Sequence, residues 1–382
     1  MKTDDLKKTD AAPLKVRLKA PSASGSCCCP SDKIRMKYSP GASWVTGTIP
    51  TAAGPVQRVS TELLPSDIWG SVRMRFGFGR DNYRIEPGIY CVGEPDSSSP
   101  VLVTANYKMT FDSLRVELEG LNAWILVLDT KGINVWCAAG KGTFGTEELI
   151  GRIRKVGLDS IVAHRDIILP QLGASGVSAF TVTKQTGFRV NYGPVRAADI
   201  KAYIGNGMKA DAAMRTVRFN IIDRLVLTPN ELVGTIKHFL IILGILFILN
   251  MAGVGHFGKA DVYALAGAIF IGTFLTPVLL PFIPGRAFSF KGWLLGMAWA
   301  VGVLFMNGFP GIPAFGWLLS IAYLLVFPAI SAYLALNFTG CSTYTSFSGV
   351  KREMQLSLPP ILISLALGLL LVILDMVLKL LI

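Results

Sequence analysis

Long apolar runs fill the C-terminal part of the chain, and their lengths predict helices that cross a membrane. The runs cover residues 235–253, 262–283, 293–307, 314–336 and 359–382. A helix needs roughly 18 or more apolar residues to cross a bilayer core. The third run is short at about 15 residues, which predicts a span with little tilt or a re-entrant segment. We therefore expect an all-α transmembrane domain of about five helices over residues 231–382.

The preceding region, residues 41–230, has a different periodicity. Short apolar segments alternate there with amphipathic stretches, which predicts an α/β domain with an open, Rossmann-like sheet. Strands are predicted at residues 101–104, 123–128, 160–163, 179–183 and 217–222, and helices at residues 146–156 and 197–204. Residues 1–40 show little periodicity and are rich in lysine, serine and proline, which predicts a flexible basic tail.

The distribution of basic residues indicates how the chain lies in a membrane. Placing the α/β domain in the cytoplasm puts Arg286 with Lys291, and Lys351 with Arg352, in cytoplasmic loops and leaves Lys259 outside. Cytoplasmic loops carry an excess of lysine and arginine. Since no signal peptide opens the chain, we expect a multi-pass protein of the cytoplasmic (inner) membrane, with the α/β domain facing the cytoplasm.

Composition agrees with a chain of two parts. Hydrophobic residues make up 51% of the sequence and the mean hydropathy is +0.49, too apolar for one ordinary soluble domain. The net charge of +12 is spread over the tail, the α/β domain and the loops that flank the spans. This spread favours contact with anionic membrane lipid over nucleic acid, for which the sequence has no motif.

Residues 133–145, which read INVWCAAGKGTFG, hold the candidate chemistry. They follow the strand predicted at 123–128, and ligands of open α/β sheets bind beyond the carboxyl ends of strands. Asn134 is a good helix N-cap residue, so Cys137 is predicted in the first turn, near backbone N–H groups that favour a thiolate. Lys141 adds positive charge. Four residues with almost no side chain would let a large flat ligand approach the backbone: Ala138, Ala139, Gly140 and Gly142.

This pattern favours a thiolate ligand that faces a macrocycle over a cysteine that is merely a small buried apolar residue. A P-loop is excluded because Val135 stands at its first glycine and Gly142 at its hydroxyl residue. His164 begins a His-Arg-Asp triplet that lacks the other kinase motifs. It is also the sole histidine in the α/β domain that could activate Cys137 as a hydrolase nucleophile, an alternative that stays open.

The eight residues Asn-Val-Trp-Cys-Ala-Ala-Gly-Lys, from Asn134 to Lys141, resemble the cap-helix motif of the HgcA family. These are membrane-bound corrinoid proteins of bacterial and archaeal mercury methylation, and they are related to the large subunit of the corrinoid iron–sulfur protein. Further similar segments are Thr-Ala-Asn-Tyr-Lys from Thr104, Gly-Thr-Phe-Gly-Thr from Gly142, Asn-Phe-Thr-Gly from Asn337 and Ser-Thr-Tyr-Thr from Ser342.

The resemblance implies a cobalamin-type corrinoid whose cobalt takes the Cys137 sulfur as its lower axial ligand, which makes Cys137 both the metal ligand and the catalytic residue. The helix over the corrin would comprise Asn134, Val135, Trp136, Ala138 and Ala139, followed by Gly140 and Lys141, and Thr104 and Thr110 would be hydrogen-bonding neighbours. The Asp-x-His-x-x-Gly motif of cobalamin proteins is missing, which agrees with sulfur ligation.

The implied activity is that of a corrinoid-dependent methyltransferase that converts Hg(II) to methylmercury. An anionic sulfur donor stabilises the electron-poor cobalt left when a methyl carbanion departs. Because the chain lacks iron–sulfur cysteine spacing, electrons would come from a ferredoxin-like partner of the HgcB type with two 4Fe-4S clusters. The methyl donor would derive from methyltetrahydrofolate. The alternative is a membrane-bound corrinoid methyl carrier in one-carbon metabolism with a different methyl acceptor.

Several residues outside this motif have two interpretations. Cys27, Cys28 and Cys29 form either a soft-metal scavenger or an incidental or lipid-modified cluster. Cys341 is either a mercury relay or a structural residue. Asp375 and Lys379 are expected to pair near the end of the last span. The spans themselves serve as an anchor or as a transporter, although few charged residues lie within them.

Overall fold

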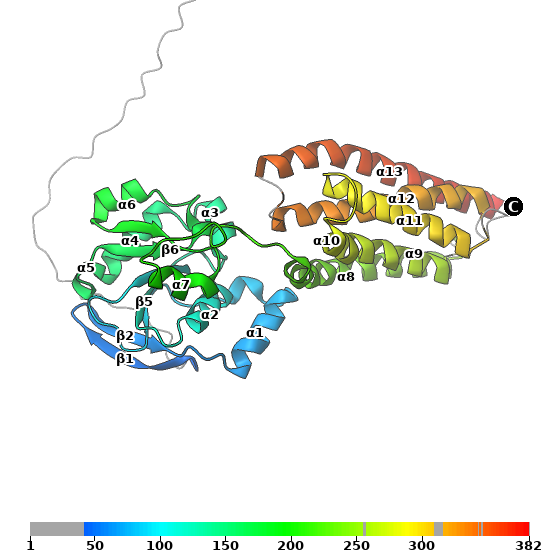
Figure 1. Cartoon of the computed structure of the whole chain (residues 1–382). Helices are drawn as coiled ribbons and strands as arrows, with labels where there is room; N and C mark the ends of the chain where they lie inside the picture. The colour runs from blue at the N-terminus through cyan, green and yellow to red at the C-terminus, as the bar shows by residue number, and fades with distance from the viewer. Residues whose placement is uncertain (1–41, 255–256, 309–315, 343, 345–346, 382) are drawn as a thin grey trace, which may run out of the picture. The chain divides into compact units, whose positions relative to one another are not determined.

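Seven strands form one open sheet in the α/β domain of the computed structural model (Figure 1). The structure describes residues 42–254, 257–308, 316–342, 344 and 347–381, so the predicted tail with its three cysteines lies outside the described residues. The spatial order of the strands is β1 (Val45–Thr51), β2 (Gly54–Val59), β3 (Gly88–Val92), β5 (Ala123–Leu128), β4 (Val101–Ala105), β6 (Asp166–Leu169) and β7 (Arg189–Tyr192).

Four neighbouring strands, β5, β4, β6 and β7, run parallel and form the Rossmann-like part of the sheet. The other half is mixed, since β3 is antiparallel to β5 and parallel to β2, and β1 is antiparallel to β2. Every residue of β4 and β5 is buried. A strand buried on both faces needs a layer of helices on each side, which is why both strands read as continuous apolar runs.

The two layers form two separate cores. One face of the sheet packs against α3 (Val135–Lys141), α4 (Thr146–Val156), α5 (Leu158–Ile161) and α6 (Ala179–Thr186). The opposite face packs against α2 (Lys108–Glu117) and α7 (Ile200–Gly205), through residues such as Phe111, Leu114 and Tyr203. The predicted α/β class and the open sheet are therefore confirmed. Helix α1 (Pro65–Arg75) precedes β3.

Three predicted strands are wrong, and capping explains two of them. Residues 179–183 fall in α6, which Ser178 starts by accepting a hydrogen bond from the Thr181 backbone N–H, whereas the β-branched residues suggested a strand. Residues 217–222 run into a helix because Asn220 and Asp223 form a reciprocal capping box. Residues 160–163 overlap α5, and the strand that follows is β6. The predicted helix at residues 197–204 is confirmed as a 3₁₀ turn (Ala197–Asp199) followed by α7.

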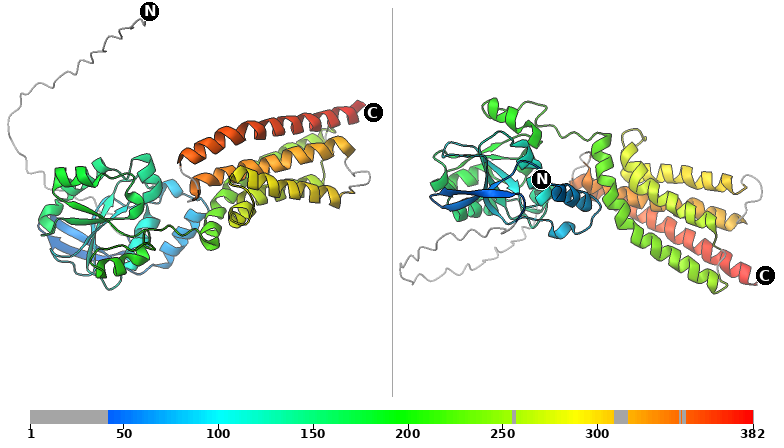
Figure 2. Two further views of the ribbon diagram at one scale, coloured as in Figure 1. Left: turned by 45° about the horizontal axis from the view of Figure 1, so that its top comes forward. Right: turned by 90° about the horizontal axis from the view of Figure 1, so that it is seen from below.

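Among the described residues of the C-terminal region, five helices are long and apolar enough to cross a membrane, as predicted. Figure 2 shows this helical region from two further sides. The five helices are α8 (Ile221–Met251), α9 (Lys259–Phe270) continued through a π-helical turn (Ile271–Leu275) into α10 (Thr276–Leu279), α11 (Phe288–Met306), α12 (Gly316–Asn337) and α13 (Phe347–Leu381). The third of these, α11, has 19 residues and is therefore longer than the apolar run of about 15 residues from which it was predicted. The helix begins at Phe288, before the predicted start at Trp293. The polar residues Ser289 and Lys291 interrupt the apolar run in the sequence, but they are buried within the helix bundle.

Small residues let α11 and α12 pack closely. A Cβ atom added to Gly292 would lie 2.5 Å from the Ser331 carbonyl oxygen, and one added to Gly296 would lie 2.7 Å from the Ser331 Cβ. Such close approach through small residues is typical of helices that pack within a membrane. Helix α12 runs without a break through Pro328, and Lys379 pairs with Asp375 at 2.7 Å as expected. Lys351 and Arg352 lie within α13 rather than in a loop.

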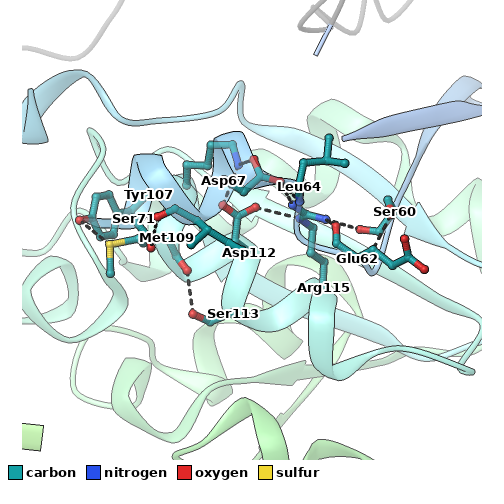
Figure 3. A network of polar contacts seen from close by, with 12 residues as sticks. Ser60, Glu62, Leu64, Asp67, Ser71, Tyr107, Met109, Asp112, Ser113 and Arg115 are labelled. Atoms are coloured by element: carbon teal, nitrogen blue, oxygen red, sulfur yellow. Dashed lines mark hydrogen bonds and ion pairs between the residues drawn. The ribbon is translucent and has the colours of Figure 1, made fainter. Parts of the chain in front are cut away.

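A buried group of charged residues joins α1 to α2, and we call it the α1–α2 clasp: Asp67, Lys108, Asp112 and Arg115 (Figure 3). The Arg115 guanidinium is fully buried, and it donates to Asp67 at 2.7 Å and to Asp112 at 2.8 Å. Its remaining nitrogen donates to the carbonyls of Ser60 and Glu62. Lys108 bonds both carboxylates at 2.6 Å. Each charge is therefore compensated.

The clasp has a predictable pH dependence. Burial alone raises the pKa of Asp67, but hydrogen bonds from Lys108 and the Leu64 N–H, with the charges of Lys108 and Arg115, outweigh it and hold the pKa below 3.8. A carboxyl group whose pKa is lower in the folded protein than in the unfolded chain stabilises the fold. This stabilisation is fully present at pH values above the pKa of the unfolded chain, and it is lost as the pH falls through the pKa of the folded protein. We expect the thermal unfolding midpoint of the wild type to be higher than that of Asp67→Asn. The difference between the two midpoints should be constant near pH 7 and should decrease as the pH falls below 3.8. A difference independent of pH would contradict this.

Candidate functional site

The loop between β5 and α3 places the sequence motif at the carboxyl end of the parallel strands. Lys131 and Gly132 both have positive φ, 60° and 73°, which turns the chain sharply after Asp129. Helix α3 then begins at Val135, and the Asn134 side chain accepts a hydrogen bond from the Cys137 N–H at 2.9 Å. The N-cap predicted for Asn134 is therefore present, and Cys137 lies in the first turn of α3.

Asn106, at the end of β4, fixes this loop. Its side-chain oxygen accepts from the backbone N–H groups of Thr130 and Gly132, both at 3.0 Å, and from the Thr130 hydroxyl at 2.9 Å. Its amide nitrogen donates to Asp129. Sequence reasoning did not single out Asn106 as a site residue. A buried asparagine directly after an apolar strand is the signal that could have found it, because a buried amide needs several partners.

Helix α3 has a buried face and an open face. Successive residues of a helix are separated by about 100°, which puts Val135, Ala138 and Ala139 on one side and Trp136, Cys137, Gly140 and Lys141 on the other. The first group is buried in the core and the second is exposed. The small side chains of Ala138 and Ala139 thus serve packing: a Cβ added to Gly176 would lie 3.1 Å from the Ala139 Cα.

A cavity of about 310 Å³ lies next to the start of α3. Its walls come from β4, α2, β6 and the segments that follow β6 and β7. Five residues predicted as cofactor neighbours line it: Thr104, Thr110, Asn134, Val135 and Trp136. The other predicted residues, Cys137, Ala138, Ala139, Gly140 and Lys141, are not part of its lining. The structure therefore gathers half of the predicted set around one cavity and sets Cys137 on the adjoining open face.

The two cysteines whose side chains are described differ in availability. Cys91 on β3 is fully buried, and burial raises the pKa of its thiol to about 12, so it stays protonated at neutral pH. Cys137 is exposed, and a Cβ added to the neighbouring Gly140 would have no atom within 4 Å. The surface beside the Cys137 sulfur is therefore low and open. It can accept a broad ligand, whereas Cys91 can accept none.

Comparison with known proteins identifies relatives of this domain. Residues 76–204 match the family model described as the CO dehydrogenase/acetyl-CoA synthase delta subunit. The chain is 34% identical over 122 residues to the corrinoid/iron–sulfur protein large subunit of Moorella thermoacetica, covering 31% of this chain and 27% of that protein. It is 31% identical over 127 residues to the acetyl-CoA decarbonylase/synthase complex subunit gamma of Methanopyrus kandleri, covering 33% and 27%.

A third relative is the corresponding gamma subunit of Methanocaldococcus jannaschii, 39% identical over 93 residues, covering 24% of this chain and 19% of that protein. The match thus spans about a quarter of the relatives' own length or less. The similarity concerns the α/β domain, including α2, α3 and the cavity, and the relatives include a corrinoid/iron–sulfur protein and subunits of acetyl-CoA decarbonylase/synthase complexes.

The cap on α3 can be tested by itself. Asn134→Ala removes the acceptor for the Cys137 N–H, and loss of an N-cap costs about 1 kcal/mol. Backbone hydrogen exchange in α3 should accelerate about five-fold, because this energy corresponds to that factor in the local opening equilibrium. Asn134→Ser keeps a capping oxygen and is the matched control, with exchange near the wild-type rate. Equal acceleration in both variants would argue against the cap.

Proposed function

We propose that the α/β domain binds a cobalamin-type corrinoid against the open face of α3, where the Cys137 sulfur would be the protein ligand that holds its cobalt. One observation carries this proposal: an exposed cysteine sits on a flat helix face beside a cavity, in the region similar to a corrinoid/iron–sulfur protein. The residues fit such a group, since Gly140 leaves the face beside the sulfur free and Trp136 offers a large ring at its edge.

The residues of the chain would share the work as follows. Cys137 would donate an electron pair from its sulfur, and the Asn134 cap holds the first turn that carries it. Val135, Ala138 and Ala139 anchor the helix in the core, so that the sulfur stays in place when a ligand leaves. Thr104 and Thr110 line the adjoining cavity and would be hydrogen-bonding neighbours of the ligand. Lys141 adds a positive charge at the exposed end of the same helix.

We further propose that the methyl acceptor is inorganic Hg(II), as the HgcA-like motif from Asn134 to Lys141 suggests. When bound, the corrinoid would supply a methyl group that passes to Hg(II) with both electrons of its bond. An anionic sulfur ligand favours that departure because it stabilises the positive charge left behind. Reducing electrons would come from a ferredoxin-like partner of the HgcB type with two 4Fe-4S clusters, and the methyl donor would derive from methyltetrahydrofolate.

A different methyl acceptor is the alternative to Hg(II). The relatives of the α/β domain include a gamma subunit of an acetyl-CoA decarbonylase/synthase complex, so the alternative that we keep is a methyl carrier in one-carbon metabolism. In either case the five apolar helices would hold the chain in the cytoplasmic membrane with the α/β domain on the cytoplasmic side. Both proposals assign the same role to Cys137 and differ in what meets the opposite side of the corrinoid.

The acceptor can be determined with the full chain in detergent. The chain is loaded anaerobically with methylcobalamin and offered either Hg(II) or a thiol acceptor such as homocysteine, against protein-free controls. We expect the cobalt–carbon absorption band to disappear with Hg(II) faster than without protein, with methylmercury as the product. Transfer to the thiol alone would favour the one-carbon alternative, and no protein-dependent transfer to either would contradict mercury methylation.

A further inference from the structure

Helix α1 presents an apolar face to its surroundings and a charged residue to the protein interior, the reverse of an ordinary surface helix. Trp69 is 64% exposed, Ile68 is 53% exposed and Phe76, directly after the helix, is 41% exposed. Asp67 is 4% exposed on the opposite side. With about 100° between successive residues, Ile68, Trp69, Val72 and Phe76 fall on one continuous stripe. We call this stripe the α1 outer face.

The helix is fixed in this orientation. Asp67 is held inward by the α1–α2 clasp, through ion pairs to Lys108 at 2.6 Å and to Arg115 at 2.7 Å (Figure 3). Gly70 lies on the same side of α1 as Asp67 and packs closely against Tyr83. A Cβ atom at this position would clash with the Tyr83 hydroxyl oxygen. The helix cannot rotate about its axis to bury Trp69 without breaking a buried ion pair. Exposure of the α1 outer face is therefore built into the domain.

Basic side chains border the α1 outer face. Arg73 and Arg75 flank the apolar stripe on its two sides, and Arg80 and Arg84 follow in the next segment. All four are exposed, whereas the one acidic residue of α1, Asp67, is buried and paired. An apolar stripe with tryptophan, flanked by arginines whose charged ends can reach outward, suits the boundary between lipid headgroups and acyl chains.

The rest of the chain indicates which surface meets this face. The described part of the same polypeptide carries five helices long and apolar enough to cross a membrane, so a bilayer that they cross would be attached to the α/β domain through the chain itself. Anionic headgroups complement the arginines, since each basic residue near such a surface adds to the attraction. We propose that the α1 outer face lies in the headgroup region of an anionic phospholipid bilayer, with Trp69 and Ile68 inserted and Arg73 and Arg75 on lipid phosphates.

Membrane contact of this kind would fix the orientation of the candidate functional site relative to the membrane. The clasp joins α1 to α2, and Thr110, Ser113 and Leu114 of α2 line the cavity beside α3. A bilayer that holds α1 thus holds the cavity at one constant angle to the membrane. This inference is independent of the proposed corrinoid and stands whatever ligand the cavity takes.

Photoactivatable lipid tests the contact in the full chain. The protein is reconstituted into nanodiscs of phosphatidylcholine and phosphatidylglycerol that contain a lipid with a diazirine in its acyl chain, irradiated, and digested with trypsin. We expect lipid adducts on peptides 59–73 and 76–80, which contain the α1 outer face. Peptide 166–184 is the matched control, since it carries Phe180, 77% exposed on α6, without flanking arginines, and should remain unlabelled.

A double variant separates membrane insertion from incidental contact. Ile68→Gln with Trp69→Gln should lower labelling of peptide 76–80 at least five-fold and leave the thermal unfolding midpoint unchanged, because both side chains point outward. Replacing phosphatidylglycerol with phosphatidylcholine should also reduce the labelling. Absence of adducts from peptides 59–73 and 76–80, or equal labelling of peptide 166–184, would overturn the proposal and leave a protein partner as the occupant of this face.

Discussion

Replacing Cys137 with alanine is expected to abolish protein-dependent methyl transfer to Hg(II) while the chain remains folded. In the proposed function the exposed sulfur of Cys137 supplies the electron pair that would hold cobalt at the open face of α3. Since losing even a supporting residue of a metal site costs 10–100-fold, losing the ligand itself should lower the rate by more than about 100-fold. Methylmercury formation, measured against the protein-free rate, gives the answer.

Two controls make this result specific. Cys137 is exposed, so Cys137→Ala should change the free energy of unfolding by less than about 0.5 kcal/mol. Cys91→Ala removes the buried thiol on β3, and the folded fraction of this variant should retain methyl transfer. Wild-type activity in Cys137→Ala would show that the sulfur is not the ligand. Equal loss in Cys91→Ala at unchanged stability would show that the assay reports on thiols in general.

The second large effect is predicted for Arg115. Arg115→Ala leaves the carboxylates of Asp67 and Asp112 buried with Lys108 as their remaining cation, and breaking a buried ion pair from one side costs about 3–5 kcal/mol. Because domains are stable by about 5–15 kcal/mol, much of the stability of the α/β domain would be lost. Proteolysis of the detergent-solubilised chain in increasing urea, read as the loss of intact protein, measures the change.

Arg189→Ala is the matched control for charge removal. Arg189 also binds a carboxylate, Asp166 at 2.6 Å, but its side chain is 67% exposed. An exposed pair contributes about 0–1 kcal/mol. A small effect for Arg189 beside a large one for Arg115 would assign the difference to burial. If both variants changed the free energy of unfolding by a similarly small amount, water would have to reach the charged groups of the α1–α2 clasp.

Local signals in the sequence were sufficient for the elements that depend on neighbouring residues. The N-cap at Asn134 and the short helix after it follow from residues within one turn, and the structure has both. The five apolar helices follow from run length alone. The parallel strands β4 and β5 were found because burial on both faces makes them continuously apolar.

Features that depend on distant residues were missed. Asn106 binds a loop more than 20 residues away, and the clasp joins Asp67 to Arg115 across 48 positions, so local patterns do not indicate the partners of either. Residues 179–183 were predicted as a strand, and the cap at Ser178 that starts α6 was not recognised. The smallness of Ala138 and Ala139 was interpreted as room for a ligand, whereas both are buried in the core.

The ligation of cobalt by the Cys137 sulfur is tested most directly by cobalt K-edge X-ray absorption. The full chain, as wild type and as Cys137→Ala, is loaded with the corrinoid and the two spectra are compared. We expect one sulfur scatterer bound to cobalt in the wild type and its replacement by a lighter atom in the variant. Identical spectra without a sulfur contribution would contradict ligation by Cys137, and with it the proposed function of the α3 face.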